Sequence, residues 1–310
     1  MAGLAAGRRL QAAGVETVIL EKSRGPGGRC STRRQDGFIW DTGATSLLPR
    51  GRSLGHVIQN ELSTDDLVEV KKPVSLHDNF RISPGDPARG GQRWAYGSGM
   101  NRLAHLLAEG LDIRPKSNVD RIERSATGYE ILGETYDRVV ITVPTPQASL
   151  LLWSIDERRP VANVRYRPCL SVGLGYDIPL PETPYFALLD ATQRHPMVWL
   201  SLESVKCPTR APAVVVQFNR EYSRRWYLRP EEDMVATAAQ YMVALYGPAF
   251  AKPVASDLMR WKYAQPEALA PFEEVNPPGS RLILAGDALY GGHLEEAFEC
   301  GYKAAEMLLA

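Results

Sequence analysis

Glycines, an acid and an arginine near the start of the chain have the types and spacing of a phosphate-binding turn. Gly3 lies in an Ala- and Leu-rich segment, Glu21 ends a short apolar run eighteen positions later, and Gly27-Gly28-Arg29 follows. Glycines let backbone amides approach an anion, and arginine is a forked donor to phosphate. An acid about 20 residues after such a turn suits ribose hydroxyls. Taken alone, Gly3 and Glu21 fit two interpretations equally well: part of a dinucleotide site, or an ordinary helix glycine and a surface acid. The glycines that follow Glu21 favour the dinucleotide site.

The elements around this pattern predict a parallel α/β sheet. Residues 1–13 have helical spacing of apolar residues and end at Gly14, a typical C-cap, and residues 18–20 form a buried strand that ends at Glu21. A parallel sheet alternates strand and helix, so a helix at residue 1 has no earlier strand to pack against. We therefore expect a first strand and two fingerprint glycines to be missing before Gly3.

The rest of the chain consists of predicted strands and helices separated by segments rich in Gly and Pro. The stretch from 83 to 99 is rich in Gly and Pro and is predicted to be a loop. We expect the β-branched strand before Pro144 and Pro146 to end there, because proline is expected to continue neither a strand nor a helix. The predicted strands are 119–122, 129–132, 137–143, 171–176, 198–202, 214–218 and 281–285, and the predicted helices are 101–111, 231–245 and 294–309.

These elements predict an α/β fold: a Rossmann-like nucleotide domain, truncated at its first strand, into which an α+β substrate domain is inserted. The nucleotide domain is expected at residues 1–50, 90–150 and 278–310, and the substrate domain at residues 51–89 and 151–277. The site is expected between the two domains.

The charge balance and the residue composition indicate which classes of binding partner to expect. Thirty-six basic residues balance 36 acidic ones, so no global field favours nucleic acid or an anionic membrane. No apolar run reaches the roughly 20 residues of a membrane span. The four cysteines form no metal-ligand or C-x-x-C spacing, which is typical of a reducing cytoplasm. We expect a cytoplasmic protein with a small-molecule substrate, no metal, and no nucleic-acid or membrane partner.

On these motifs the chain resembles the flavin-containing amine oxidase superfamily. The resemblance rests on Gly3, Glu21, the Gly27-Gly28-Arg29 element and the closing Gly286-Asp287, and it extends to the Gly-rich start of the helix after residue 97. It implies FAD as cofactor, with Asp287 near the ribityl and phosphate groups and the backbone of Val119 near adenine. The residues expected at the cofactor are Gly3, Glu21, Lys22, Gly28, Arg29, Gly43, Ala44, Val119, Gly286, Asp287 and Glu295.

A narrower similarity, to bacterial renalase-like proteins, rests on the segment 260–266 and on Gly291-Gly292. It implies hydride transfer from a reduced, mis-isomerised nicotinamide to the flavin, with O2 reoxidation giving H2O2. Such a donor carries an activated hydride, so no protein base is required and no catalytic side chain is assigned.

Four residues are candidates for substrate contact. Trp261 and Tyr263, two apart on one strand face, would wall a planar substrate, and Tyr290 and His293 precede the last helix. Each also fits ordinary packing, capping or exposure. The N-terminus of the last helix is expected to face the flavin ring, where its partial positive charge would stabilise the reduced form, although Glu296 would oppose that charge.

Two other functions stay open. One is a related FAD amine oxidase or desaturase-like enzyme that acts on an amine or a carbon–carbon bond. The other is a flavin-free binding protein, because the phosphate loop is incomplete in the sequence as written.

Overall fold

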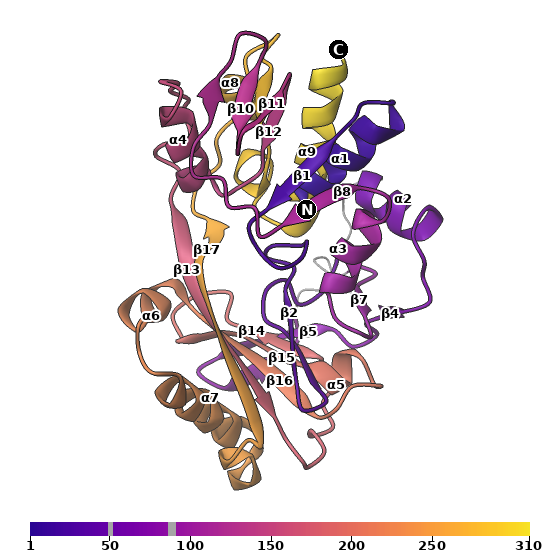
Figure 1. Cartoon of the computed structure of the whole chain (residues 1–310). Coiled ribbons are helices and arrows are strands. Elements are labelled where there is room, and N and C mark those ends of the chain that lie inside the picture. Colours follow the sequence, from indigo (N-terminus) through magenta and orange to yellow (C-terminus); the bar gives the residue numbers. More distant parts are fainter. Residues whose placement is uncertain (49–51, 86–90) are drawn as a thin grey trace.

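A parallel layer forms one end of the molecule in the computed structural model, which describes residues 1–48, 52–85 and 91–310 (Figure 1). In this layer β1 (Val18–Glu21) pairs in parallel with β8 (Asp112–Pro115), and β12 (Val139–Ile141) pairs in parallel with β18 (Leu282–Leu284). No ladder joins the two pairs within the described residues, so β1 and β12 each keep one unpaired edge.

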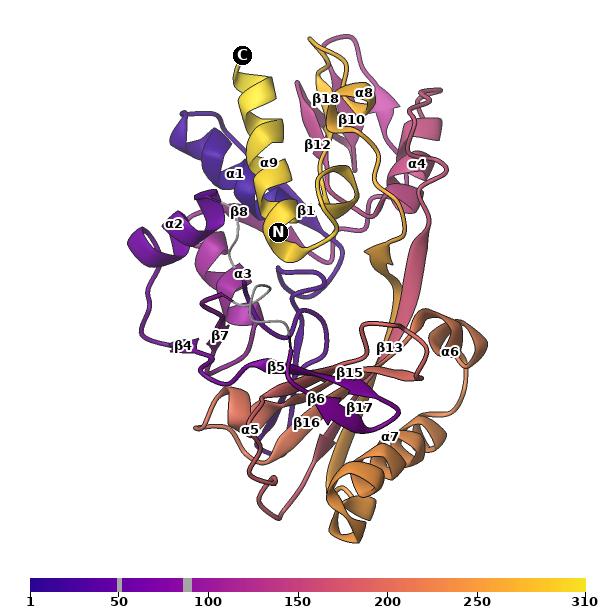
Figure 2. The same cartoon turned by 180° about the vertical axis from the view of Figure 1, so that it is seen from behind.

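Two helices far apart in sequence cover this layer together. α1 (Ala2–Ala12) packs along α9 (Leu294–Leu309), and Figure 2 shows the two side by side from behind. Their crossing is close because Gly301 has no side chain: a Cβ there would lie 2.1 Å from the Ala2 carbonyl oxygen. α3 (Asn101–Ala108) and α2 (Arg52–Asn60) complete the helices on this side.

Smaller elements border the parallel layer. They are β4 (Leu67–Glu69) paired with β7 (Trp94–Tyr96), the antiparallel sheet of β9 (Glu123–Arg124), β10 (Tyr129–Ile131) and β11 (Glu134–Tyr136), and the helices α4 (Thr145–Trp153) and α8 (Phe272–Val275).

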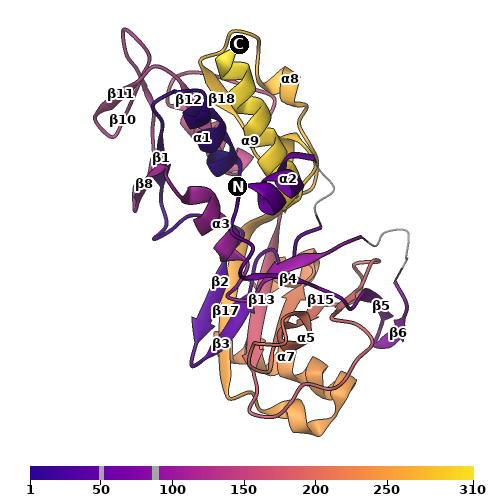
Figure 3. The same ribbon diagram turned by 90° about the vertical axis from the view of Figure 1, so that its right-hand side faces the viewer.

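A seven-stranded sheet forms the other end, in the order β17-β13-β16-β15-β14-β5-β6. Its strands are β5 (Val74–Asp78), β6 (Arg81–Ser83), β13 (Tyr166–Gly175), β14 (Ala187–Leu189), β15 (Met197–Leu202), β16 (Ala213–Phe218) and β17 (Ala255–Pro266). Neighbours are antiparallel except β14 and β5. The long strands β13 and β17 reach toward the parallel layer (Figure 3). Short α5 (Glu203–Lys206) lies between β15 and β16, and α6 (Arg220–Arg225) follows β16.

The two faces of the seven-stranded sheet have different covers. One face packs a hydrophobic core under α7 (Glu231–Tyr246) and the 3-10 turn Pro248–Ala251. The other face meets the hairpin of β2 (Thr32–Gln35) and β3 (Phe38–Asp41). A Cβ at Gly173 would lie 2.6 Å from the Trp40 ring, so glycine on β13 lets this indole lie directly against the sheet.

Most predicted elements are confirmed, and two are wrong in part. Residues 118–122 are a loop, so Val119 follows β8 instead of lying in a strand; its neighbours Asn118 and Asp120 hydrogen bond to each other. Pro146 lies in the first turn of α4, where a missing amide proton breaks no helical bond, so the prolines do not prevent a helix there. The domain limits expected near residues 50 and 90 fall outside the described residues.

Candidate active site

A cavity of about 3610 Å³ lies between the parallel layer and the seven-stranded sheet. It runs from the unpaired sides of β1 and β12, past the N-terminal ends of α1 and α9, to β13, β16 and β17. The cofactor residues predicted from the sequence line it: Gly3, Glu21, Lys22, Gly28, Arg29, Gly43, Ala44, Val119, Gly286, Asp287 and Glu295. The structure thus brings together residues up to 292 positions apart, from Gly3 to Glu295.

The N-terminus of α1 opens on this cavity. Met1 occupies the N-cap position and no described side chain caps the helix, so the first amides of α1 are available to an anion. Gly3 lies in this first turn, and a Cβ there would lie 3.1 Å from the Thr142 hydroxyl. The helix end therefore suits a phosphate group, and glycine keeps it close to the end of β12.

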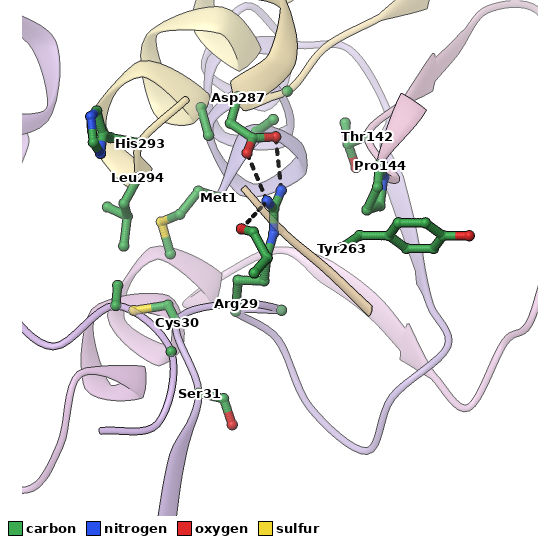
Figure 4. Close-up of a pocket in the computed structure, with 18 of the residues that line it drawn as sticks. Met1, Arg29, Cys30, Ser31, Thr142, Pro144, Tyr263, Asp287, His293 and Leu294 are labelled. Carbon is green, nitrogen blue, oxygen red and sulfur yellow. Dashed lines mark hydrogen bonds and ion pairs between the residues drawn. The ribbon is translucent and has the colours of Figure 1, made fainter. Parts of the chain in front are cut away.

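An ion pair between Arg29 and Asp287 crosses the cavity, as Figure 4 shows. Arg29 Nη1 donates to Asp287 Oδ2 at 2.7 Å and Nη2 donates to Oδ1 at 2.8 Å, while the Tyr166 hydroxyl also donates to Oδ1. Burial alone would lower the pKa of Arg29, but the pairing with Asp287 raises it. The ion pair therefore fixes the Arg29 guanidinium beside the turn that follows β18, inside the cavity.

The loop after β3 is shaped by a close approach. A Cβ at Gly43 would lie 1.9 Å from the Arg29 carbonyl oxygen, and the Ala44 amide donates to that same oxygen at 3.0 Å. Only glycine fits Gly43 without moving this loop. The Gly27-Gly28-Arg29 turn and the Gly43-Ala44 loop therefore form one unit of the cavity wall.

Trp261 and Tyr263 lie on the wall facing the parallel layer. Trp261 Nε1 donates to the Thr42 carbonyl at 2.8 Å, and Gln217 Nε2 donates to the Gly43 carbonyl at 2.9 Å. Tyr263 meets the Tyr166 ring edge to face at 5.9 Å and lies near Pro144 (Figure 4). The Trp261 indole is thus fixed by the neighbouring loop, which makes it a rigid planar surface.

The N-terminus of α9 is lined by acidic residues. Glu295 accepts the Leu48 amide at 2.8 Å, and burial raises the pKa of its carboxyl. Glu296 keeps a buried oxygen, Oε2, that has no hydrogen-bond partner among the described residues. His293 is exposed but borders the cavity. Burial therefore disfavours the charged form of Glu295 close to the N-terminus of α9.

Tyr290 is the one predicted site residue that the structure leaves outside the cavity. Its side chain is 46% exposed and its ring lies 5.8 Å from Lys303 Nζ. The 3-10 turn Asp287–Leu289 directs Asp287 inward and leaves the following residue on the surface. The structure therefore leaves Tyr290 out of the cavity lining, and a substrate contact of Tyr290 stays a prediction.

A buried cluster of four charges behind the Gly43 loop was missed from the sequence. Lys206 Nζ lies 2.7 Å from both Asp41 Oδ2 and Glu203 Oε2, and Arg210 Nη1 lies 2.9 Å from Asp41 Oδ2 and also pairs with Glu203. Burial would raise the pKa of Asp41, but Lys206 and Arg210 lower it to about 2. The spacing of Glu203 and Lys206 was the only sequence signal, and it is common on solvated helices.

The described residues contain no group of three or more metal-ligating side chains. The donors along the cavity instead suit a dinucleotide flavin. α1 and Arg29 can hold phosphates, Glu21 can meet ribose hydroxyls, and α9 can face an electron-rich ring.

Comparisons with solved structures agree with this arrangement. The chain is similar to a protein assigned as protoporphyrinogen oxidase from Exiguobacterium sp. 255-15, with a TM-score of 0.79 and 16% identity over 100% of this chain and 96% of that one. Cyclohexylamine oxidase from Brevibacterium oxydans IH-35A (TM-score 0.73) and a putrescine oxidase (0.74) are each 13% identical, over 99% of this chain and 96% of theirs. The fold is that of the FAD-dependent amine oxidases.

Sequence comparison gives the family. The model of the flavin-containing amine oxidoreductases matches residues 1–96 and 86–309, and the chain belongs to this family. A zeta-carotene-forming phytoene desaturase of Myxococcus xanthus is 50% identical over 46 residues, a match that spans 15% of this chain and 9% of the desaturase. Family membership confirms the predicted superfamily and its flavin cofactor, FAD.

No helix among the described residues combines the length and hydropathy of a membrane span.

Proposed function

We propose that this chain is an FAD-dependent oxidase that takes a hydride from a reduced, mis-isomerised nicotinamide. The observation that carries the proposal is the cavity wall formed by β13, β16 and β17: it offers two aromatic surfaces, Trp261 and Tyr263, and its described lining residues include no Asp, Glu or His. A planar dihydronicotinamide fits such a wall, and its hydride is already activated.

The residues of the chain then position and shield the reaction. FAD, when bound, supplies the two-electron acceptor. Trp261, anchored to the Thr42 carbonyl, keeps the donor ring parallel to one plane, and the N-terminus of α9 stabilises the negative charge that hydride transfer creates.

The proposed turnover balances with O2 as the second substrate. The donor loses a hydride and becomes an oxidised nicotinamide, and O2 takes the two electrons and two protons as H2O2. One of these protons comes from solvent. The donor, O2 and a proton are the only consumed species, so no further reductant is required.

Anaerobic mixing of the FAD-loaded protein with isomeric dihydronicotinamides and with primary amines tests the proposal. We expect the flavin absorbance to bleach with a dihydronicotinamide and to return on addition of O2, with one H2O2 formed per donor. Bleaching by amines alone would support an amine oxidase and overturn the proposal. A purified protein that gains no flavin absorbance with added FAD would support a flavin-free binding protein.

The cellular location of the protein is a separate proposal. We propose a cytoplasmic location from the sequence, and fractionation of the native cells with an antibody to the chain would check it.

A further inference from the structure

The substrate side of the cavity is basic. Its wall is contributed by lining residues between 42 and 93 and between 167 and 265. The charged members among the described residues there are Lys71, Lys72, Arg93, Arg167, Arg220, Arg260 and Lys262, and none of the described lining residues in these two ranges is Asp or Glu. Acids line the cavity on the α9 side instead. A cationic amine would meet a repulsive wall, whereas an anion would be attracted.

Arg167 lies on this basic wall and donates hydrogen bonds from two of its guanidinium nitrogens. Its Nη1 donates to Gln193 Oε1 at 3.4 Å and its Nη2 donates to Gln265 Oε1. Both acceptors are neutral amides, so within the described part of the chain Arg167 is half-buried without a carboxylate partner. A guanidinium has five N–H donors, and these two bonds leave donors for a further acceptor.

The loop that carries Gln193 is fixed at the edge of the cavity. Gln193 adopts the left-handed backbone conformation, with φ of 61°, which residues other than glycine rarely do. Asn219 holds it there, because Asn219 Nδ2 donates to the Gln193 carbonyl at 3.1 Å and to the His195 carbonyl at 2.9 Å. Asn219 is itself 6% exposed. Such strain persists where the surroundings determine the conformation, as at binding sites.

Arg220 adds a second cation beside Asn219. Its Nη1 pairs with Glu267 at 2.9 Å and its Nε lies 3.4 Å from the Glu221 carboxylate, so two acids offset its charge. Arg260 differs, because it donates to the carbonyls of Tyr227 and Arg229 and contributes only its charge. Of Arg167, Arg220 and Arg260, only Arg167 has neither a carboxylate nor a backbone carbonyl as a partner among the described residues.

We propose that Arg167, held by Gln193 and Gln265, binds a phosphate group of the substrate, with the other cations of the basic wall adding to its positive field. The inference rests on the proposed function and deepens it: the hydride donor is a nicotinamide nucleotide and not a free base or riboside. A guanidinium fork matches two phosphate oxygens, which gives both affinity and orientation. Binding of the phosphate at Arg167 would thereby set how far the nicotinamide ring extends toward Trp261.

Kinetics of Arg167→Gln in the FAD-loaded protein test this role. The donors are an isomeric dihydronicotinamide mononucleotide and the matching riboside, which differ by one phosphate. We expect the variant to raise KM for the mononucleotide about tenfold to a hundredfold, with kcat unchanged, and to leave KM for the riboside within about twofold. Arg167→Lys, which keeps the charge and loses the fork, should fall between. Arg224→Gln, an exposed arginine outside the cavity, is the matched control.

A binding experiment separates this inference from the proposed reaction. Calorimetric titration of the FAD-loaded protein with oxidised nicotinamide mononucleotide and with nicotinamide riboside needs no turnover. We expect the mononucleotide to bind at least about tenfold more tightly, and Arg167→Gln to abolish the difference. Equal affinities for the two compounds overturn the phosphate site even if both reduced donors react. If the mononucleotide binds as expected but neither reduced donor bleaches the flavin, the phosphate site stands and the oxidase reaction fails. Absence of binding by both compounds overturns both.

Discussion

Removal of Lys206 would break the buried charge cluster that supports the Gly43 loop. Lys206, Asp41 and Glu203 have side chains that are 0% exposed, and with Arg210 they form a balanced set of two cations and two anions. Lys206→Met leaves one negative charge in excess and two carboxylates close to one guanidinium. Breaking a buried pair by removing one partner costs about 3–5 kcal/mol, and this should lower Tm by roughly 10 °C.

The destabilisation should depend on pH in a defined direction. Lys206 and Arg210 hold the pKa of Asp41 at about 2, whereas burial raises the pKa of Glu203. Without Lys206 we expect Glu203 to take up a proton in the folded state, with a pKa above its unfolded value. A raised folded-state pKa gives stability that is present at low pH and is lost as the pH rises. The deficit of Lys206→Met should therefore be larger at pH 8 than at pH 5.

Urea unfolding at the two pH values measures both effects. Lys252→Met, at an exposed lysine, should stay within about 0.5 kcal/mol of the wild-type free energy of unfolding. The double variant Lys206→Met with Glu203→Gln restores charge balance and should regain part of the loss. A loss below about 1 kcal/mol for Lys206→Met, or a loss that is greater at pH 5, would refute the reasoning.

Three further predictions address the cofactor, the loop and a buried histidine. Asp287→Asn should weaken FAD binding about tenfold or more in a fluorescence titration, because the charge partner of Arg29 is lost; Asp177→Asn, on the surface, should have no effect, and equal affinities would remove Asp287 from the site. Gly43→Ala should cost about 1–3 kcal/mol of unfolding free energy, since the Cβ overlaps the Arg29 carbonyl, and an unchanged urea midpoint would contradict that overlap. Burial lowers the pKa of His77, whose Nδ1 has no hydrogen-bond partner in the part of the chain that the structure describes, so the free energy of unfolding should fall as the pH drops below about 6.5. His77→Phe should flatten this pH dependence in urea titrations, and an identical slope for the variant would exclude His77 as its source.

Local patterns allowed much of the parallel layer and the cofactor to be predicted. The helix at residues 1–13, the strand that ends at Glu21 and the last helix at residues 294–309 follow from apolar spacing and cap residues, which act over a few positions. The glycines of the phosphate-binding turn could also be predicted, because their role depends on neighbouring residues in the sequence. The strand predicted around Val119 failed, because a short apolar segment does not by itself choose between a strand and a packed loop.

By itself the sequence determined the family, the flavin cofactor and the order of the main elements, because these depend on local spacing and on motif residues near one another. Tertiary structure alone decided that Arg29 pairs with Asp287, that Lys206 neutralises Asp41, and that Tyr290 lies outside the cavity lining. It also placed Arg167 on a basic wall. These pairings join residues more than 150 positions apart, so they arise from strand register and sheet packing, which no local pattern records.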